Sequence, residues 1–324
     1  MRGPAFTRRT MIGGAGVVAA MPALSATAPT VQRLELFDAH LHFFTNDVAR
    51  YPIDPRNARE PEAIFRERIM EDPGTPAKMF PLWEAEGVVG GAGVQYSGAY
   101  KTDNRYLLDL ADQYPAKIHP EIIVNGRDPA SPALATQLAA TRRVRALRLT
   151  GFGEGAGSFP WLESDPVLDV WAVAGKLGLP IGITFLPPKA TEASLAAVKR
   201  LAERFPQQTI ILEHFGWLAG TPRDPGLLPG HLALAPSRNV HFKFTTNNID
   251  ELTAMGRPTA AFLRRAIDIF GVNRLMWGSD AGNTLRPYPG MVADAVAATA
   301  SLSATERRRV LHDNGWAMFA GPLR

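Results

Sequence analysis

The sequence predicts an α/β protein that folds as a (β/α)8 barrel, also called a TIM barrel. Short β-branched runs alternate with longer amphipathic stretches along the chain, which is typical of repeated βα units around a parallel sheet. Eight such units occupy roughly 290 residues, and a barrel of this kind typically has about 250. An open doubly wound sheet with fewer strands fits this pattern less well.

The strand pattern recurs at eight places, which are residues 34–37, 88–94, 118–124, 144–149, 180–185, 209–213, 240–244 and 274–277. Helical patterns lie between them, for example at residues 104–114, 133–141, 166–177, 190–205 and 259–270. Gly or Pro precedes many of the strands, as in EAEGVV and KLGLPI. These residues end each helix before the chain returns to the sheet.

Two segments are longer than the barrel needs. Residues 46–76 are rich in Pro, Arg and Glu, and we expect them to form a long first loop over the barrel mouth. Residues 218–238, with several prolines and glycines, are predicted to form a second loop. No domain linker is evident after residue 28, so residues 29–324 are predicted to be a single domain.

Residues 1–28 read as a twin-arginine export signal that is cleaved from the mature protein. Arg8 and Arg9 precede a mildly apolar, Gly- and Ala-rich stretch at residues 11–24. That stretch is shorter than the roughly 20 apolar residues that a membrane-spanning helix needs. We therefore expect a periplasmic or secreted protein.

The basic character of the chain comes partly from this leader. The formal net charge of +4 falls to +1 without residues 1–28, because three arginines and no acidic residue are lost. The mature protein thus gives no reason to expect binding to nucleic acid or to a membrane. We expect a small-molecule substrate, and the sequence leaves the oligomeric state open, including a homo-oligomer.

Polar residues capable of chemistry recur where the predicted strands end, which is where (β/α)8 barrels place their active sites. His40 and His42 follow the first strand, and their spacing puts both on one face of an extended chain. The others are Arg148 on the fourth strand, His214 at the end of the sixth, Lys243 on the seventh and Asp280 after the eighth. Because buried parallel strands are usually apolar throughout, this placement predicts a site.

The motifs FDAHLHFF, ILEHFGW, LMWGSD and RVLHDNGWAMF resemble the amidohydrolase superfamily, and within it the amidohydrolase-related branch. The stretches TDNRYLLDLADQYPAKI and VRALRLTG are similar to the 2-pyrone-4,6-dicarboxylate lactonases and sugar-lactone hydrolases of that branch. The resemblance extends from about Phe37 to the C-terminus. It implies a hydrolase in which His40, His42, His214 and Asp280 are the catalytic residues.

The sequence departs from the superfamily pattern at one position that is expected to bind a metal. The resemblance implies a histidine on the fifth strand in metal-dependent relatives, but that strand reads PIGITFLPP. The chain also has no cysteine, so any metal would have to bind to His, Asp or Glu. We therefore expect that no cofactor is required. A single Zn²⁺, if bound, would be held by His40, His42 and Asp280.

The residues suggest how a lactone or similar cyclic ester would be opened. Asp280 would activate water as the base, and the three histidines would polarise the carbonyl as hydrogen-bond donors. Arg148 would hold a substrate carboxylate or oxyanion with its planar guanidinium, and Lys243 would assist. Tyr96 and Ser97, in VQYSGAY after the second strand, are further candidates for substrate binding.

Two alternatives remain open at this stage. The first is a mononuclear Zn-dependent decarboxylase, or a C–C or amide hydrolase of the same superfamily. The second belongs to another class: a periplasmic ligand-binding protein built on an inactive barrel. Substrate identity is set by loop side chains whose geometry the sequence does not show.

Overall fold

The computed structural model describes residues 34–56, 58, 60–152, 160–186, 189–219, 224 and 226–322, together with residues 1 and 3. The predicted export signal therefore lies almost wholly outside the described residues, as does the segment 153–159. Residues 34–324 form one compact unit, separate from residues 1–33. Among the described residues, no helix is both long enough and apolar enough to cross a membrane.

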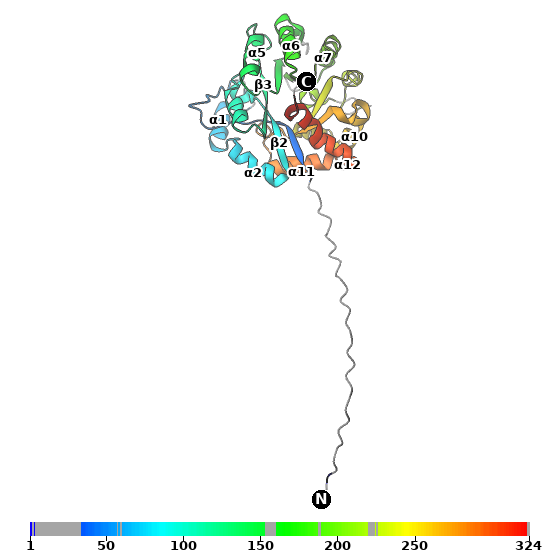
Figure 1. The fold of residues 1–324 in the computed structure, drawn as a ribbon. Helices are drawn as coiled ribbons and strands as arrows, with labels where there is room; N and C mark the ends of the chain where they lie inside the picture. Colours follow the sequence, from blue (N-terminus) through cyan, green and yellow to red (C-terminus); the bar gives the residue numbers. More distant parts are fainter. Residues whose placement is uncertain are drawn as a thin grey trace, which may run out of the picture. The chain divides into compact units, whose positions relative to one another are not determined.

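Eight parallel strands form the sheet in the order of the sequence, each hydrogen-bonded to the next (Figure 1). They are β1 (Leu36–Leu41), β2 (Val88–Val94), β3 (Ile118–Ile123), β4 (Ala146–Phe152), β5 (Ile181–Leu186), β6 (Ile210–Leu212), β7 (Val240–Thr245) and β8 (Leu275–Gly278). Contacts between the first and last strands bring the sheet round on itself. Leu41 forms a bridge with Ala281, and the backbone N–H of Asp280 donates to the carbonyl of His40 at 2.8 Å. The predicted (β/α)8 barrel is confirmed.

Helices follow the strands and surround the sheet (Figure 1). The α-helices are α1 (Glu62–Glu71), α2 (Pro76–Glu86), α3 (Ser97–Tyr100), α4 (Arg105–Gln113), α5 (Ser131–Thr141), α6 (Asp165–Leu177), α7 (Glu192–Arg204), α8 (Pro229–Leu232), α9 (Thr246–Ala254), α10 (Thr259–Phe270), α11 (Tyr288–Ala298) and α12 (Ala304–Arg308). The short helical turns are η1 (Pro160–Glu163), η2 (Glu213–Gly216), η3 (Val272–Arg274), η4 (Arg309–Asp313) and η5 (Trp316–Ala320).

The first strand and the two long loops differ from the sequence-based expectation. Strand β1 runs to Leu41 instead of ending at Phe37. Its polar residues Asp38 and His40 are fully buried at the seam, which is the line along which β1 meets the end of β8. The segment 46–76 was expected to be a loop but contains α1, which buries Phe65 and Ile69. The segment 218–238 likewise contains the single turn α8.

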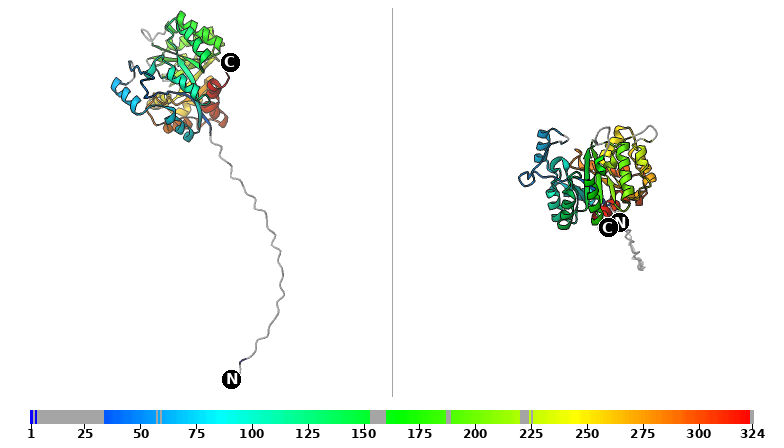
Figure 2. Two further views of the ribbon diagram at one scale, coloured as in Figure 1. Left: turned by 60° about the vertical axis from the view of Figure 1, so that its left-hand side comes forward. Right: turned by 90° about the horizontal axis from the view of Figure 1, so that it is seen from above.

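The barrel interior has an apolar floor and a charged upper layer. The floor consists of Phe37, Ala39, Ala92, Ala146, Ile211, Met276 and Phe319. Phe319 belongs to η5, which contacts β1, β2 and β3 and closes that end of the barrel. In the right-hand view of Figure 2, these last turns (red) lie at one end of the barrel and α1 (blue) lies toward the other. Any chemistry is thereby confined to the end where the strands finish.

Candidate active site

Asp38 joins the first and last strands just below the site. Its Oδ1 accepts hydrogen bonds from the backbone N–H of Ser279 at 2.8 Å and of His40 at 3.1 Å, and its Oδ2 accepts from the Tyr288 hydroxyl at 3.0 Å. Burial raises the pKa of Asp38 to about 6, although these hydrogen bonds oppose the shift. The carboxyl thus holds β1 in register with β8, which sets the position of His40.

Three histidines meet around the carboxylate of Asp280. Oδ1 of Asp280 lies 3.3 Å from Nε2 of His40, 3.3 Å from Nε2 of His42 and 4.0 Å from Nε2 of His214. The two Nε2 atoms of His40 and His42 are 3.2 Å apart. All four predicted catalytic residues are therefore brought together, although they come from strands far apart in the sequence.

The two oxygens of Asp280 have different surroundings. Oδ2 accepts hydrogen bonds from Asn247 Nδ2 at 2.8 Å, Asn283 Nδ2 at 3.0 Å and Thr284 Oγ1 at 2.8 Å. Oδ1 is buried and has no hydrogen-bond partner within the described part of the chain. Burial alone would raise the pKa of Asp280, but interactions with the histidines hold it well below the usual range. The group is therefore an ionised carboxylate with one free oxygen directed at the histidines.

Backbone strain occurs at both Asp280 and His214. Asp280 has a φ of 58° and His214 a φ of 50°, which is the left-handed region that residues other than glycine rarely adopt. Such strain is tolerated where the surrounding structure imposes it, and it is concentrated at functional sites. The chain bends sharply at these two strand ends, so each side chain turns toward the centre of the barrel mouth.

The histidine rings are held by partners on their far sides. Nδ1 of His42 lies 2.9 Å from the carbonyl oxygen of Val94, which can only accept, so Nδ1 carries a proton and Nε2 is unprotonated in the neutral ring. Nδ1 of His214 lies 2.9 Å from Thr245 Oγ1, and its ring stacks on Trp217 at 4.5 Å. Burial is the main cause that lowers the pKa values of His40 and His214 to about 3. Both rings are therefore neutral at pH 7.

A buried ionic cluster lies beneath the histidines. Lys243 Nζ is 2.5 Å from Glu121 Oε2 and 2.9 Å from Glu213 Oε1, and all three side chains are fully buried. Lys243 was expected to assist with substrate, but its ammonium is bound by these two carboxylates. Neither glutamate was predicted from the sequence to be a site residue. A charged residue inside an apolar strand, as in IHPEII and IILEHFG, was the signal that could have found them.

The three predicted substrate-binding residues other than Lys243 have different settings. Arg148 is buried on β4, and its Nε has no hydrogen-bond partner among the residues described. The Tyr96 ring lies 5.1 Å from that of His42, and its hydroxyl accepts a hydrogen bond from Arg68 at 2.8 Å. Ser97 is half-buried and begins α3. Arg148 and Tyr96 thus lie at or beside the histidines.

A divalent metal ion fits the donor atoms at the centre of the site. His40, His42 and Asp280 form a buried group whose ligand atoms lie within 4.8 Å of one another. Two imidazole nitrogens and one carboxylate oxygen are ligands that Zn²⁺ accepts. The buried Oδ1 of Asp280 has no other described partner, which is what a carboxylate ligand would show before it is bound. The structure therefore contains a group of residues suited to a metal ion, as the sequence proposed for the case of a bound Zn²⁺.

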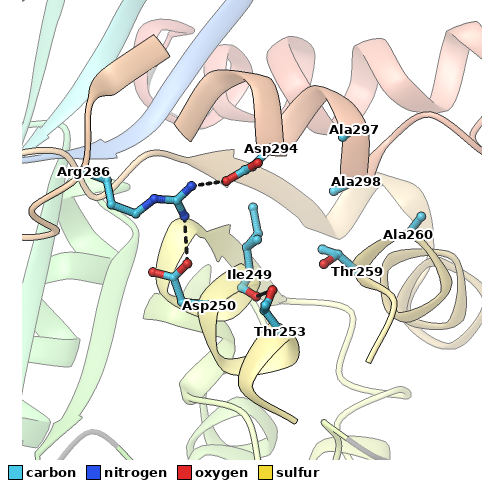
Figure 3. Close-up of a pocket in the computed structure, with 9 residues that line it drawn as sticks. All are labelled: Ile249, Asp250, Thr253, Thr259, Ala260, Arg286, Asp294, Ala297 and Ala298. Atoms are coloured by element: carbon cyan, nitrogen blue, oxygen red, sulfur yellow. Dashed lines mark hydrogen bonds and ion pairs between the residues drawn. The ribbon is translucent and has the colours of Figure 1, made fainter. Parts of the chain in front are cut away.

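One surface concavity lies away from the site. A cavity of about 450 Å³ is formed by residues of α9, α10 and α11 together with Arg286, which binds Asp250 and Asp294 (Figure 3). None of the site residues lines it. Its two aspartates are ion-paired with Arg286, and its other walls are alanine, threonine and isoleucine side chains, so the chemistry is assigned to the barrel mouth.

Known proteins resemble this chain in sequence and in fold. The curated relative L-fucono-1,5-lactonase of Burkholderia ambifaria is 29% identical over 255 residues, which are 75% of this chain and 79% of the relative.

Solved structures share the fold, among them the following three. An amidohydrolase from Burkholderia multivorans with bound zinc has 20% identity and a TM-score of 0.68, covering 89% of this chain and 100% of the other. A probable 2-pyrone-4,6-dicarboxylic acid hydrolase from Acinetobacter baumannii with bound citric acid has 16% identity and a TM-score of 0.65, covering 88% and 99%. The 2,6-dihydroxybenzoate decarboxylase from Rhizobium has 15% identity and a TM-score of 0.61, also covering 88% and 99%.

The family model described as Amidohydrolase matches residues 37–320, which include every residue of the site. This match confirms the resemblance and the enzyme class that the sequence motifs indicated. The chain belongs to the amidohydrolase family and is a hydrolase.

Proposed function

We propose that this enzyme hydrolyses a lactone, the cyclic ester of a hydroxy acid. The proposal is supported by the 29% identity with L-fucono-1,5-lactonase and by the chemistry of the site. One observation carries it furthest: the buried, ionised carboxylate of Asp280 keeps one oxygen without a described partner, opposite three imidazole rings. That oxygen is the atom available to a reacting water.

Asp280 acts as the base in this proposal. Three donors hold Oδ2, so the carboxylate cannot rotate freely and Oδ1 faces the centre of the site. Water bound to Oδ1 would lose a proton to it as the water oxygen attacks the lactone carbonyl. The ring C–O bond would then break, and the leaving ring oxygen would take the proton from Asp280, which gives the open hydroxy acid and restores the carboxylate. His214 lies 4.0 Å from Oδ1 and is neutral, so its Nε2 can hold the same water or the substrate on the opposite side.

A divalent cation, which we take to be Zn²⁺, would be bound by Nε2 of His40, Nε2 of His42 and Oδ1 of Asp280. Oδ1 could still accept the proton of a water, because a carboxylate oxygen carries two lone pairs. When bound, the cation would supply Lewis-acid polarisation of the lactone carbonyl and make bound water more acidic. The Nε2 atoms of His40 and His42 suit this role better than the role of hydrogen-bond donors that the sequence suggested. In His42 a proton already lies on Nδ1, toward Val94.

Arg148 is proposed to bind the oxyanion or a carboxylate of the substrate. Its guanidinium is buried, and the Nε atom lacks a described partner. A buried guanidinium is stabilised by an acceptor, and an anionic group of the substrate can provide one. Tyr96, packed beside His42, would form a wall of the same pocket, with Ser97 next to it.

We also propose that the protein reaches the periplasm, or the outside of the cell, by the twin-arginine route. The support is the Arg8-Arg9 pair and the apolar stretch that follows it. N-terminal sequencing of the protein from a periplasmic fraction would test this proposal, together with the variant Arg8→Lys/Arg9→Lys. A variant exported as efficiently as the wild type would contradict it.

The activity itself is tested with a panel of sugar lactones and dicarboxylate lactones, using protein of measured metal content before and after chelation. Asp280→Asn should reduce kcat by about 10²- to 10⁴-fold, as expected for loss of a general base. Asp250→Asn is the matched control, because Asp250 is a half-exposed partner of Arg286 remote from the site. Carbon dioxide release without lactone opening would favour a decarboxylase, and saturable binding without turnover would favour a binding protein.

A further inference from the structure

The far side of His40 contacts a carboxylate. Nδ1 of His40 lies 2.5 Å from Oε2 of Glu213, and both side chains have no exposed surface. Two unprotonated acceptors would repel each other at this separation, so a proton must lie between them. The proton belongs either to the imidazole or to the carboxyl group.

The surroundings of Glu213 favour the ionised carboxylate. Lys243 Nζ lies 2.9 Å from the other oxygen of Glu213, and it is also 2.5 Å from Glu121. This positive charge beside one oxygen of Glu213 favours the ionised form of the carboxylate. The proton therefore lies on Nδ1 of His40. The contact between Lys243 Nζ and the same Nδ1 is longer, at 3.5 Å, and does not compete with the carboxylate.

We propose that Glu213 is a positioning residue, which holds His40 in the tautomer that carries its proton on Nδ1 and presents an unprotonated Nε2 to Asp280 and His42. Lys243 and Glu121 hold Glu213 in place in turn. The inference concerns the site of the proposed function and rests on that function for its catalytic meaning. Glu213 itself does not touch the reacting atoms.

The consequence is a cluster of three acceptors, which a cation bound between them would stabilise. Nε2 of His40 and Nε2 of His42 are 3.2 Å apart, and each lies 3.3 Å from Oδ1 of Asp280. Without Glu213, His40 could place its proton on Nε2, which would turn one of the three acceptors into a donor. A carboxylate behind a histidine ligand typically fixes its tautomer and increases its basicity toward a cation.

Glu213 could instead be regarded as a metal ligand, because His40, Glu213 and His214 form a second buried group with ligand atoms within 4.8 Å of one another. The ammonium of Lys243 argues against this. It lies 2.9 Å from Glu213 and 3.5 Å from Nδ1 of His40, so a fixed positive charge already occupies that side of the ring. We therefore assign Glu213 to charge-assisted contacts with His40 and Lys243 and not to coordination.

Histidine tautomers can be read directly by long-range ¹H–¹⁵N NMR of protein labelled with ¹⁵N-histidine. The chain has 7 histidines, so a His40→Gln sample would identify the His40 signals. We expect a neutral His40 ring protonated at Nδ1, and conversion to the other tautomer or to a mixture in Glu213→Gln. Glu251→Gln is the matched control, because it makes the same change at a partly buried carboxyl that accepts hydrogen bonds from Asn248 and Leu218 instead.

Binding of Zn²⁺ alone, measured by calorimetry on metal-free protein, provides a second readout. Loss of a carboxylate behind a histidine ligand typically weakens metal binding about 10- to 100-fold. We expect such a loss in Glu213→Gln and none in Glu251→Gln. An Nε2-protonated His40 in the wild-type protein would overturn the proposal even if the variant did not fold, and equal Zn²⁺ affinity in the folded variant and the wild type would overturn it as well. Neither readout needs a substrate, so a wrong assignment of the lactone would leave both results intact.

Discussion

His40 and Asp280 are joined twice, once through the backbone and once through their side chains. The N–H of Asp280 donates to the carbonyl of His40 at 2.8 Å, and Oδ1 of Asp280 lies 3.3 Å from Nε2 of the same histidine. The first bond helps to close the barrel between β1 and β8, and the second contact builds the site. Because the same two residues do both, a change in the closure of the barrel should directly alter the chemistry.

The seam between the two strands is the first place to test this link. A Cβ added to Gly278 would lie 2.4 Å from the His40 Cβ and 2.8 Å from its backbone nitrogen. Gly278→Ala should therefore push β1 and β8 apart and destabilise the protein by about 1–3 kcal/mol, as overpacking typically does. We expect a lower midpoint in urea unfolding and a larger loss of kcat than of substrate binding.

Gly290→Ala provides the control for that substitution. A Cβ at Gly290 would meet nothing within 4 Å, and the residue lies in helix α11, where Ala is favoured over Gly. It should stabilise the protein by about 0.4–1 kcal/mol. Equal stabilities of the two variants would show that the seam is not tightly packed.

The side chains that donate hydrogen bonds to Oδ2 of Asp280 should influence catalysis without contacting substrate. Thr284→Val removes the hydroxyl that donates to Oδ2 at 2.8 Å, while the size of the side chain is retained. Two donors instead of three would then hold the carboxylate, and we expect kcat to fall about 10-fold, since partners of ligating carboxylates typically contribute this much. Thr284→Ser restores the hydroxyl and should recover most of the activity. Failure of the serine variant to recover would assign the effect to packing.

Stability should depend on pH through Glu251. Burial raises the pKa of Glu251 from 4.5 to about 7, against the opposing hydrogen bonds from Asn248 and Leu218. The folded protein therefore holds this proton more tightly than the unfolded chain does. The resulting stabilisation is fully present below pH 4.5 and is lost as the pH rises through about 7.

Thermal unfolding of the wild type and of Glu251→Gln across this range isolates the contribution of the one group. The Tm of the wild type should fall relative to that of the variant between pH 4.5 and 7. Other buried acids titrate equally in both proteins, so they cancel in the difference. A constant difference in Tm across the range would contradict the shift.

Zn²⁺ should increase the stability of the folded protein, and this increase should depend on the residues of the site. A ligand present at about 100 times its dissociation constant raises the free energy of unfolding by about 2.7 kcal/mol. We expect Zn²⁺ to raise the Tm of the metal-free wild type and to have little effect on His42→Gln. His312→Gln serves as the control, because His312 lies in η4 and its Nδ1 contacts Asp313. A Zn²⁺ shift that is retained in His42→Gln would place the ion elsewhere.

The local sequence determined which residues could reach the site. Buried parallel strands are apolar throughout, so a histidine or aspartate at the end of such a strand stands out without any knowledge of the fold. His40, His42, His214 and Asp280 were found in this way, and the eight strands were found from their alternation with helices. Periodicity and turn residues act over a few positions, and those are the distances at which sequence is informative.

The tertiary structure alone decided which atoms face each other. Glu213 begins η2 and Lys243 lies on β7, and they meet His40 only because the sheet closes with β1 beside β8. The free oxygen of Asp280 depends on donors from α9 and from its own loop, and on a left-handed backbone at a residue whose type does not require it. These arrangements arise from strand register and barrel closure. Both are long-range packing properties, which local propensities along the chain do not encode.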